Sequence, residues 1–179
     1  MSLRNYDGLL FLGGGGHRTG KEGGNWEVLR EFAKVHYPQA SEKYSWATQD
    51  CMTLDAVPYV GSYGKNMKDF YVSTGYNKWG MTSAMVAAMI IRDKLCGMDN
   101  PLEALYSPQR TMMRPQLFAN VYEAVTNLLT FSEKRCPHMG CALKWNEDEY
   151  SWDCPCHGSR FQEDGQLIDN PATDDLKKK

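Results

Sequence analysis

Four of the six cysteines and two of the four histidines fall within residues 136–157. They form two boxes, Cys136-Pro-His138-Met-Gly-Cys141 and Cys154-Pro-Cys156-His157-Gly-Ser159. Thiolate and imidazole are common ligands of zinc and of iron. Each box offers one of each, because Cys136 stands beside His138 and Cys154 stands beside His157. The clustering predicts a metal site, since a disulfide framework would spread its cysteines over the chain.

The spacing of these residues separates the possible metals. Covalent haem needs the order C-x-x-C-H, whereas Cys154, Cys156 and His157 follow the order C-x-C-H. Structural zinc prefers pairs two to four residues apart, which Cys136 to Cys141 and Cys154 to His157 could meet, but the order Cys-x-His is less usual for zinc. Disulfides alone leave both histidines unexplained. An iron–sulfur centre is therefore the preferred interpretation, with zinc as the alternative and disulfides alone as the least favoured.

A β-hairpin is needed to bring the two boxes face to face. Residues 142–145 and 150–154 have the composition of strands, and residues 146–149 have that of a turn. From residue 130 onwards the sequence has no helical period. We expect a small all-β domain over residues 132–179, preceded by a linker and a helix over residues 107–131.

Residues 1–106 predict a mixture of strands and helices, so the expected fold class is α+β. Apolar runs and turn residues predict a buried strand over 7–12 and strands within 44–73, and helical spacing predicts helices over 26–37, 82–96 and 117–129. Asn25 and Thr82 are the expected N-caps, and Gly97 is the expected end of the second helix. We expect Met81, Met85 and Met89 to pack in the core.

The two boxes resemble the cluster-binding motifs of Rieske 2Fe-2S proteins. The resemblance implies that Cys136 and Cys154 hold one iron, while His138 and His157 hold the other. It also implies that the remaining cysteines of the boxes, Cys141 and Cys156, form a disulfide.

The resemblance extends to the environment of the cluster. Ser159 matches a serine of high-potential Rieske proteins, and hydrogen bonds to the sulfurs raise the potential. Phe161 stands where those proteins have a tyrosine, so we predict a potential below that of the respiratory type. Asn170-Pro171-Ala172 matches the loop that shields the cluster in the family.

Segments 13–20, 46–61 and 71–83 are similar, in this order, to the C-terminal part of FAD-dependent oxidoreductases of the D-amino-acid/glycine oxidase type. One subgroup of these carries a C-terminal Rieske domain. The resemblance implies that the flavin edge lies at the start of the helix at 82, where backbone N–H groups are free. The matching residues are Trp79, Gly80, Met81 and Thr82. The strand–G-x-G-x-x-G–helix unit that binds FAD is not in this sequence, so we expect weak or no FAD binding by this chain alone.

The segment Gly15–Lys21 fits the P-loop pattern G-x-x-x-x-G-K. Glu22 follows it where a P-loop has the serine or threonine that binds magnesium, so a P-loop is disfavoured. Two interpretations remain open, a flexible turn and a turn that lines a cleft. In the second, His17 and Arg18 line the substrate side.

Charge and hydropathy exclude other classes. The chain has 20 basic and 22 acidic residues and a net charge of −2, so nothing favours nucleic acid as a partner. The longest apolar stretch, Ser83–Ile91, is about half as long as a membrane span. No secretory signal is apparent, so we expect a cytoplasmic protein without a membrane span.

These observations predict a Rieske-type electron-transfer protein that is part of a flavin-dependent oxidoreductase. Its substrate is expected to be an amine or an amino-acid-like compound, and its cluster exchanges electrons with flavin or a partner protein. Whether the chain is itself an enzyme stays open, and no catalytic base can be named. One alternative is a non-enzymatic electron-transfer module whose residues 1–106 dock a redox partner. The other is a zinc-stapled interaction domain.

Overall fold

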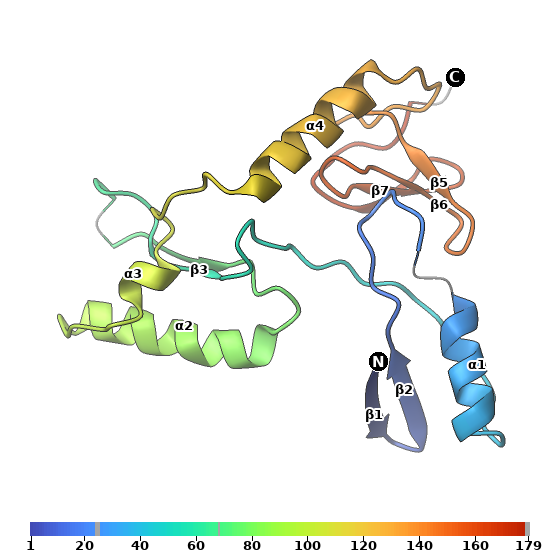
Figure 1. Ribbon diagram of the computed structural model, residues 1–179, viewed down its shortest axis with the longest axis horizontal. Coiled ribbons are helices and arrows are strands. Elements are labelled where there is room, and N and C mark those ends of the chain that lie inside the picture. The colour runs from blue at the N-terminus through green and yellow to red at the C-terminus, as the bar shows by residue number, and fades with distance from the viewer. Residues whose placement is uncertain (24–25, 68, 178–179) are drawn as a thin grey trace. The chain divides into compact units, whose positions relative to one another are not determined.

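The computed structural model describes residues 1–23, 26–67 and 69–177 and divides the chain into two compact units (Figure 1). One unit comprises residues 1–47 and 122–179, and the other comprises residues 48–121. The predicted domain boundaries after residues 106 and 131 stay a prediction, and the structure divides the chain elsewhere. The described residues form helices and antiparallel sheets, which fits a mixed α+β fold.

The chain begins with a β-hairpin of β1 (Ser2–Tyr6) and β2 (Leu9–Gly13). Asp7 and Gly8 form its turn with φ of 47° and 71°, the left-handed values that a two-residue Asp-Gly turn uses. The predicted strand over 7–12 is confirmed in part, because its apolar residues form β2, whereas Asp7 and Gly8 form the turn and the strand is not buried. Helix α1 (Trp26–His36) confirms the predicted helix, while its expected cap, Asn25, lies outside the described residues.

The sheet that carries the two boxes has four antiparallel strands in the order β5-β6-β7-β8. These are β5 (Lys144–Asn146), β6 (Ser151–Asp153), β7 (Arg160–Gln162) and β8 (Leu167–Asp169). The predicted hairpin around residues 146–149 is thus confirmed. Three of the six residues of its buried core lie in the boxes, and the core comprises Cys136, Cys141, Leu143, Cys154, Phe161 and Ala172.

The unit of residues 48–121 is built on the antiparallel pair β3 (Tyr59–Ser62) and β4 (Tyr71–Thr74). Helix α2 (Gly80–Leu95) and the short helix α3 (Glu103–Tyr106) pack on β3. Helix α4 (Pro115–Leu129) follows and continues into the other unit. The buried core here is small and comprises Val60, Ala87 and Ile90. No helix in the part of the chain that the structure describes is long and apolar enough to cross a bilayer.

Helix α2 differs from its prediction at its start. It begins at Gly80 after Trp79, and the Thr82 hydroxyl donates to the Trp79 carbonyl at 3.3 Å. Thr82 is therefore inside the first turn and is not the N-cap. The predicted end is confirmed, because Gly97 has φ of 66° and its N–H donates to Lys94 O at 3.3 Å.

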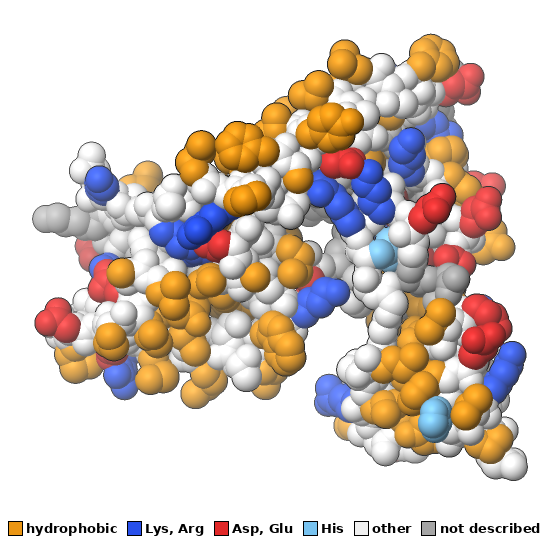
Figure 2. All heavy atoms as spheres, in the orientation of Figure 1, with side chains coloured by type: hydrophobic (Ala, Val, Ile, Leu, Met, Phe, Trp, Pro, Cys, Tyr) orange, Lys and Arg blue, Asp and Glu red, His pale blue; other side chains and the backbone are white. Residues whose placement is uncertain are grey.

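The methionines of α2 were expected in the core, and that prediction is wrong. Met81, Met85 and Met89 are 88%, 67% and 51% exposed. They recur every four residues and so share one face, whereas Ala87 and Ile90 face the opposite side and are buried in the core with Val60 of β3. Figure 2 shows hydrophobic side chains gathered on the surface over α2.

Candidate metal centre

The four-stranded sheet presents both boxes at one end. Box one (residues 136–141) leads into β5, and box two (residues 154–159) connects β6 to β7. Lys144 at the start of β5 pairs with Asp153 at the end of β6, and Asp153 pairs with Arg160 at the start of β7. The antiparallel register therefore brings the two loops to the same edge, as the hairpin prediction required.

Each box is closed by the same two backbone hydrogen bonds. The amides of Gly140 and Gly158 donate to the carbonyls of Cys136 and Cys154 at 2.8 and 2.9 Å. Each of these cysteines in turn donates its amide to the carbonyl of the sixth residue of its box, at 2.9 and 2.8 Å. The glycines have φ of 77° and 90°, where a side chain would be strained. The glycine of each box thus forms a loop that holds its ligands in place.

The four predicted ligands form one buried pair and one exposed pair. Cys136 and Cys154 are 2% and 1% exposed, and their side chains are close enough to interact. His138 and His157 are exposed, and their ring centroids lie 5.0 Å apart with an interplanar angle of 82°. The structure therefore groups sulfur with sulfur and imidazole with imidazole, although each box supplies one of each.

The electrostatics of this group suit a metal. Burial raises the pKa of Cys136, and the neighbouring Cys154 raises it further. Burial also lowers the pKa of His157, with a smaller effect from His138. The imidazole is thereby kept neutral, which is its ligating form, whereas buried thiolates need a nearby cation to ionise. Two thiolates and two neutral imidazoles are a donor set that fits a 2Fe-2S cluster with unequal irons.

A second group of sulfurs lies beside the ligands. The sulfur atoms of Cys141, Cys154 and Cys156 lie within 4.8 Å of one another. Cys141 and Cys156 are separate thiols in the structure, so the disulfide implied by the resemblance is not confirmed and stays a prediction. Burial, followed by the neighbouring Cys141, raises the pKa of Cys156. Three close sulfurs also keep zinc as a chemical alternative.

Ser159 joins box two to the loop that follows the sheet. Its hydroxyl is fully buried and accepts a hydrogen bond from the Ala172 amide at 2.9 Å. The Ser159 side chain also lowers the pKa of the Cys136 thiol, against the larger effect of burial. Phe161 beyond it is fully buried as well. A hydrogen bond to a ligand sulfur is the contact that the predicted role of Ser159 requires.

Sequence reasoning missed the ionic network that flanks box two. Arg160 is 7% exposed, and its Nε lies 3.2 Å from Asp153 Oδ1. It also pairs with Glu149 and, at 3.5 Å, with Asp169. Burial lowers the pKa of Arg160 and raises that of Asp153. The sequence does place both members of the pair next to box two, because Asp153 directly precedes it and Arg160 directly follows it.

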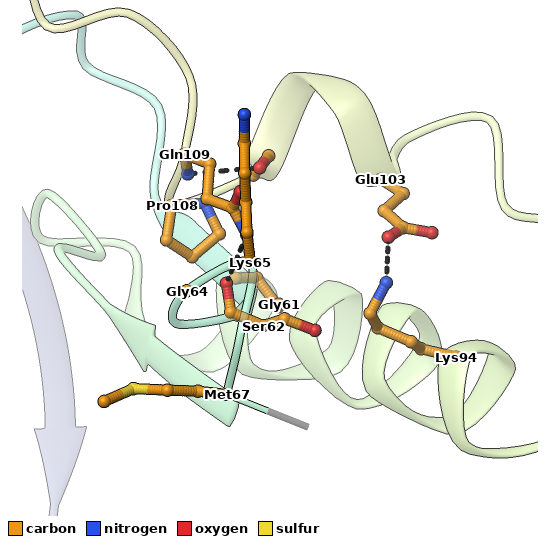
Figure 3. Close-up of a pocket in the computed structure, with 11 residues that line it drawn as sticks. Gly61, Ser62, Gly64, Lys65, Met67, Lys94, Glu103, Pro108 and Gln109 are labelled. Atoms are coloured by element: carbon orange, nitrogen blue, oxygen red, sulfur yellow. Dashed lines mark hydrogen bonds and ion pairs between the residues drawn. The ribbon is translucent and has the colours of Figure 1, made fainter. Parts of the chain in front are cut away.

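The residues matched to a flavin edge lie in the unit of residues 48–121. Trp79, Gly80, Met81 and Thr82 are together at the start of α2, and Trp79 is 71% exposed. The same unit contains a cavity of about 290 Å³ between β3 and the segments around Lys94 and Glu103 (Figure 3). Lys94 forms an ion pair with Glu103 there. The amine of Lys94 thus already has a carboxylate partner.

Residues 112–178 match the family of the Rieske [2Fe-2S] domain, so the chain contains such a domain. A Bacillus subtilis protein named as a Rieske 2Fe-2S iron-sulfur protein, YhfW, is 30% identical over 97% of this chain and 43% of its own length. The cytochrome b6-f complex iron-sulfur subunit 1 of Synechocystis is 45% identical over 24% of this chain and 24% of its own length. The chloroplastic subunit of rice is 40% identical over 29% of this chain. No solved structure matches.

The chain spans less than half of the Bacillus relative and about a quarter of the Synechocystis subunit. The names of these relatives mention iron and sulfur and do not mention flavin. The comparisons therefore support the Rieske domain and give no support to the predicted flavin oxidoreductase part.

Proposed function

We propose, since residues 112–178 contain a Rieske domain, that this protein holds a 2Fe-2S cluster and transfers single electrons. Cys136 and Cys154 would hold one iron, and His138 and His157 would hold the other. The observation that carries the proposal is the arrangement of these side chains in pairs, with two buried sulfurs beneath two exposed imidazoles 5.0 Å apart.

The exposed imidazoles define where electrons enter and leave. When bound, the cluster supplies a one-electron carrier whose potential lies between about −150 and +300 mV. His138 and His157 are neutral ligands, so the iron between them carries less negative charge and is reduced more easily than one held by thiolates. Because both rings are exposed, a partner protein can approach this side.

The potential is expected below that of the respiratory type. Ser159 would supply one hydrogen bond to a ligand sulfur, but Phe161 has no hydroxyl and cannot supply another. Replacing Phe161 with tyrosine should raise the midpoint potential, which a redox titration measures. A wild-type value near the top of the range would contradict this interpretation.

The test of the proposal is metal analysis and electron paramagnetic resonance of the purified chain. We expect two irons and about two inorganic sulfides per chain and a rhombic signal on reduction. His157→Gln should abolish the signal, because one iron loses a ligand. The control is His36→Gln, which removes an imidazole from α1 and should keep the signal. Zinc without sulfide would overturn the proposal and favour the interaction domain.

The flavin-related part is a second proposal. The Bacillus relative matches 97% of this chain, so residues outside the Rieske domain occur together with it in that protein. We propose that the start of α2, with Trp79, Gly80, Met81 and Thr82, faces the flavin edge of an oxidoreductase acting on an amine. The exposed backbone N–H groups of that helix end favour negative charge. Flavin that neither binds nor is reduced when FAD and amines are added would contradict this proposal for the chain alone.

The rival proposal is a non-enzymatic module in which residues outside the cluster site dock a redox partner. Rapid cluster reduction by a partner protein, without any flavin response, would favour it. A cytoplasmic location is part of both proposals and can be tested by cell fractionation.

A further inference from the structure

The glycine-rich loop of residues 15–21 lies against box two. A Cβ atom placed on Gly20 would stand 2.7 Å from Pro155 Cβ and 2.9 Å from Pro155 Cα and N. Gly20 has φ of 73°, so its backbone conformation also favours glycine. Pro155 is buried and follows the ligand Cys154 directly. The contact is therefore backbone to backbone and reaches the residue next to a ligand.

Two basic residues on either side of Gly20 fix the loop in this position. The Arg18 guanidinium donates a hydrogen bond from Nη2 to the Pro155 carbonyl at 3.4 Å. Lys21 Nζ lies 2.6 Å from Glu123 Oε1 on α4. Glu123 also feels the charge of Arg18, so one carboxylate faces two cations.

The hydrogen bonds continue from the loop to box one. The Asn127 amide donates to Glu123 Oε2 at 3.3 Å, and the Asn127 carbonyl accepts from Ala142, the residue after box one, at 3.0 Å. The loop therefore contacts box two directly and box one through α4. In this P-loop-like segment, Arg18 and Gly20 contact Pro155 of box two, whereas Lys21 pairs with Glu123 on α4.

We propose that residues 15–21 form a further wall of the cluster site, with Arg18 as a positioning residue that raises the reduction potential. The proposal rests on the proposed function. Reduction adds one negative charge to the cluster, and a fixed positive charge beside box two stabilises that state. A guanidinium keeps its charge at all accessible pH values, and its planar donors fix its direction. Gly20 allows the approach that brings this charge close.

The first experiment measures the midpoint potential of the cluster by a titration followed by electron paramagnetic resonance. Arg18→Gln should shift the equilibrium toward the oxidised cluster about three- to tenfold, which is roughly 30–60 mV at 59 mV per tenfold for one electron. Arg18→Lys keeps the charge and should restore most of the potential. Arg4→Gln, which removes the same charge from exposed β1, is the matched control and should leave the potential within about twofold.

An unchanged potential in Arg18→Gln, with the cluster present, would overturn this inference and leave the proposed function intact. A wild-type protein without a cluster would overturn the proposed function instead.

The second experiment tests the contact by hydrogen exchange, which does not depend on redox activity. Gly20→Ala and Gly8→Ala place the same side chain at nearly the same φ, 73° and 71°, but only Gly20 has Pro155 within reach. Gly20→Ala should speed exchange at residues 13–23 and at residues 154–159 together. Gly8→Ala should affect only the β1–β2 turn. Equal effects of the two variants on residues 154–159 would show that the loop is not a wall of the site.

Discussion

The cluster-binding sheet and the unit of residues 48–121 are both small, but they are held together differently. In the sheet, the charged side chains of Arg160 and Asp153 are buried beside a core in which three of the six residues are cysteines. In the other unit the core is aliphatic, with Val60 and Ile90 at its centre. The comparison teaches that buried polar and charged side chains are part of the interior of the sheet, whereas the core of the other unit consists of a few apolar side chains.

The unit of residues 48–121 nevertheless contains one nearly buried ion pair. Arg110 is bidentate to Asp55, with both N–O distances 2.8 Å, and its guanidinium lies 3.8 Å from the centre of the Tyr59 ring. It also donates to the Pro58 carbonyl at 3.0 Å. Residue 110 belongs to the segment predicted as linker, yet this side chain fastens the segment to β3.

The largest effect is expected from breaking the ionic network of the sheet. Arg160→Ala leaves Asp153 buried without its partner, and removing one member of a buried pair costs about 3–5 kcal/mol. The measurement is native-state hydrogen exchange of β6 and β7 in the cluster-loaded protein. Arg30→Ala is the control, because it breaks the exposed bidentate pair with Glu42 and should cost less than about 1 kcal/mol. Equal losses of stability in Arg160→Ala and Arg30→Ala would show that the buried network stabilises the sheet no more than an exposed ion pair does.

The counterpart in the other unit is truncation of its core. Ile90 is 1% exposed, and Ile90→Ala should cost about 2–4 kcal/mol through lost burial and the cavity left behind. Urea titration followed by the Val60 methyl resonances in NMR reports this unit alone. The cluster signal should stay, because the two units have separate cores. Loss of the cluster together with the fold of this unit would show that their stabilities are coupled.

More of the metal centre than of the rest of the molecule could be predicted, because its candidate ligands lie close together in the sequence. Ligand types and spacing identify the boxes, and the turn residues between them identify the hairpin that brings them together. The Asp7-Gly8 hairpin signal was also visible in the sequence, but the predicted strand included this turn and the partner strand β1 was not predicted.

Tertiary contacts account for most of what the sequence did not reveal. The Arg110–Asp55 pair joins residues 55 positions apart, and the contact of Gly20 with Pro155 joins residues still more distant. No local pattern encodes either. The prediction that the methionines of α2 are buried was wrong because hydrophobic composition does not show which face of a helix packs against a neighbouring element.

A smaller effect is expected from the titration of Asp55. Arg110 holds the pKa of this carboxyl at about 2, below its ordinary value of 3.8. The folded state therefore gains stability that is complete above pH 4 and is lost as the pH falls from about 4 to 2. The full difference amounts to about 2 kcal/mol. NMR-detected urea titrations of the unit at several pH values measure it, and Asp55→Asn should remove the pH dependence while lowering stability at neutral pH.

The smallest effect is expected at the exposed face of α2. Met85 is 67% exposed, and Met85→Lys keeps a good helix former, so the free energy of unfolding should change by less than about 0.5 kcal/mol. The same NMR experiment, run beside Ile90→Ala, tests both faces of one helix. A loss above about 2 kcal/mol for Met85→Lys would mean that this face is covered in solution. The unit would then owe its stability to a contact outside its own core, and its contrast with the cluster-binding sheet would have to be redrawn.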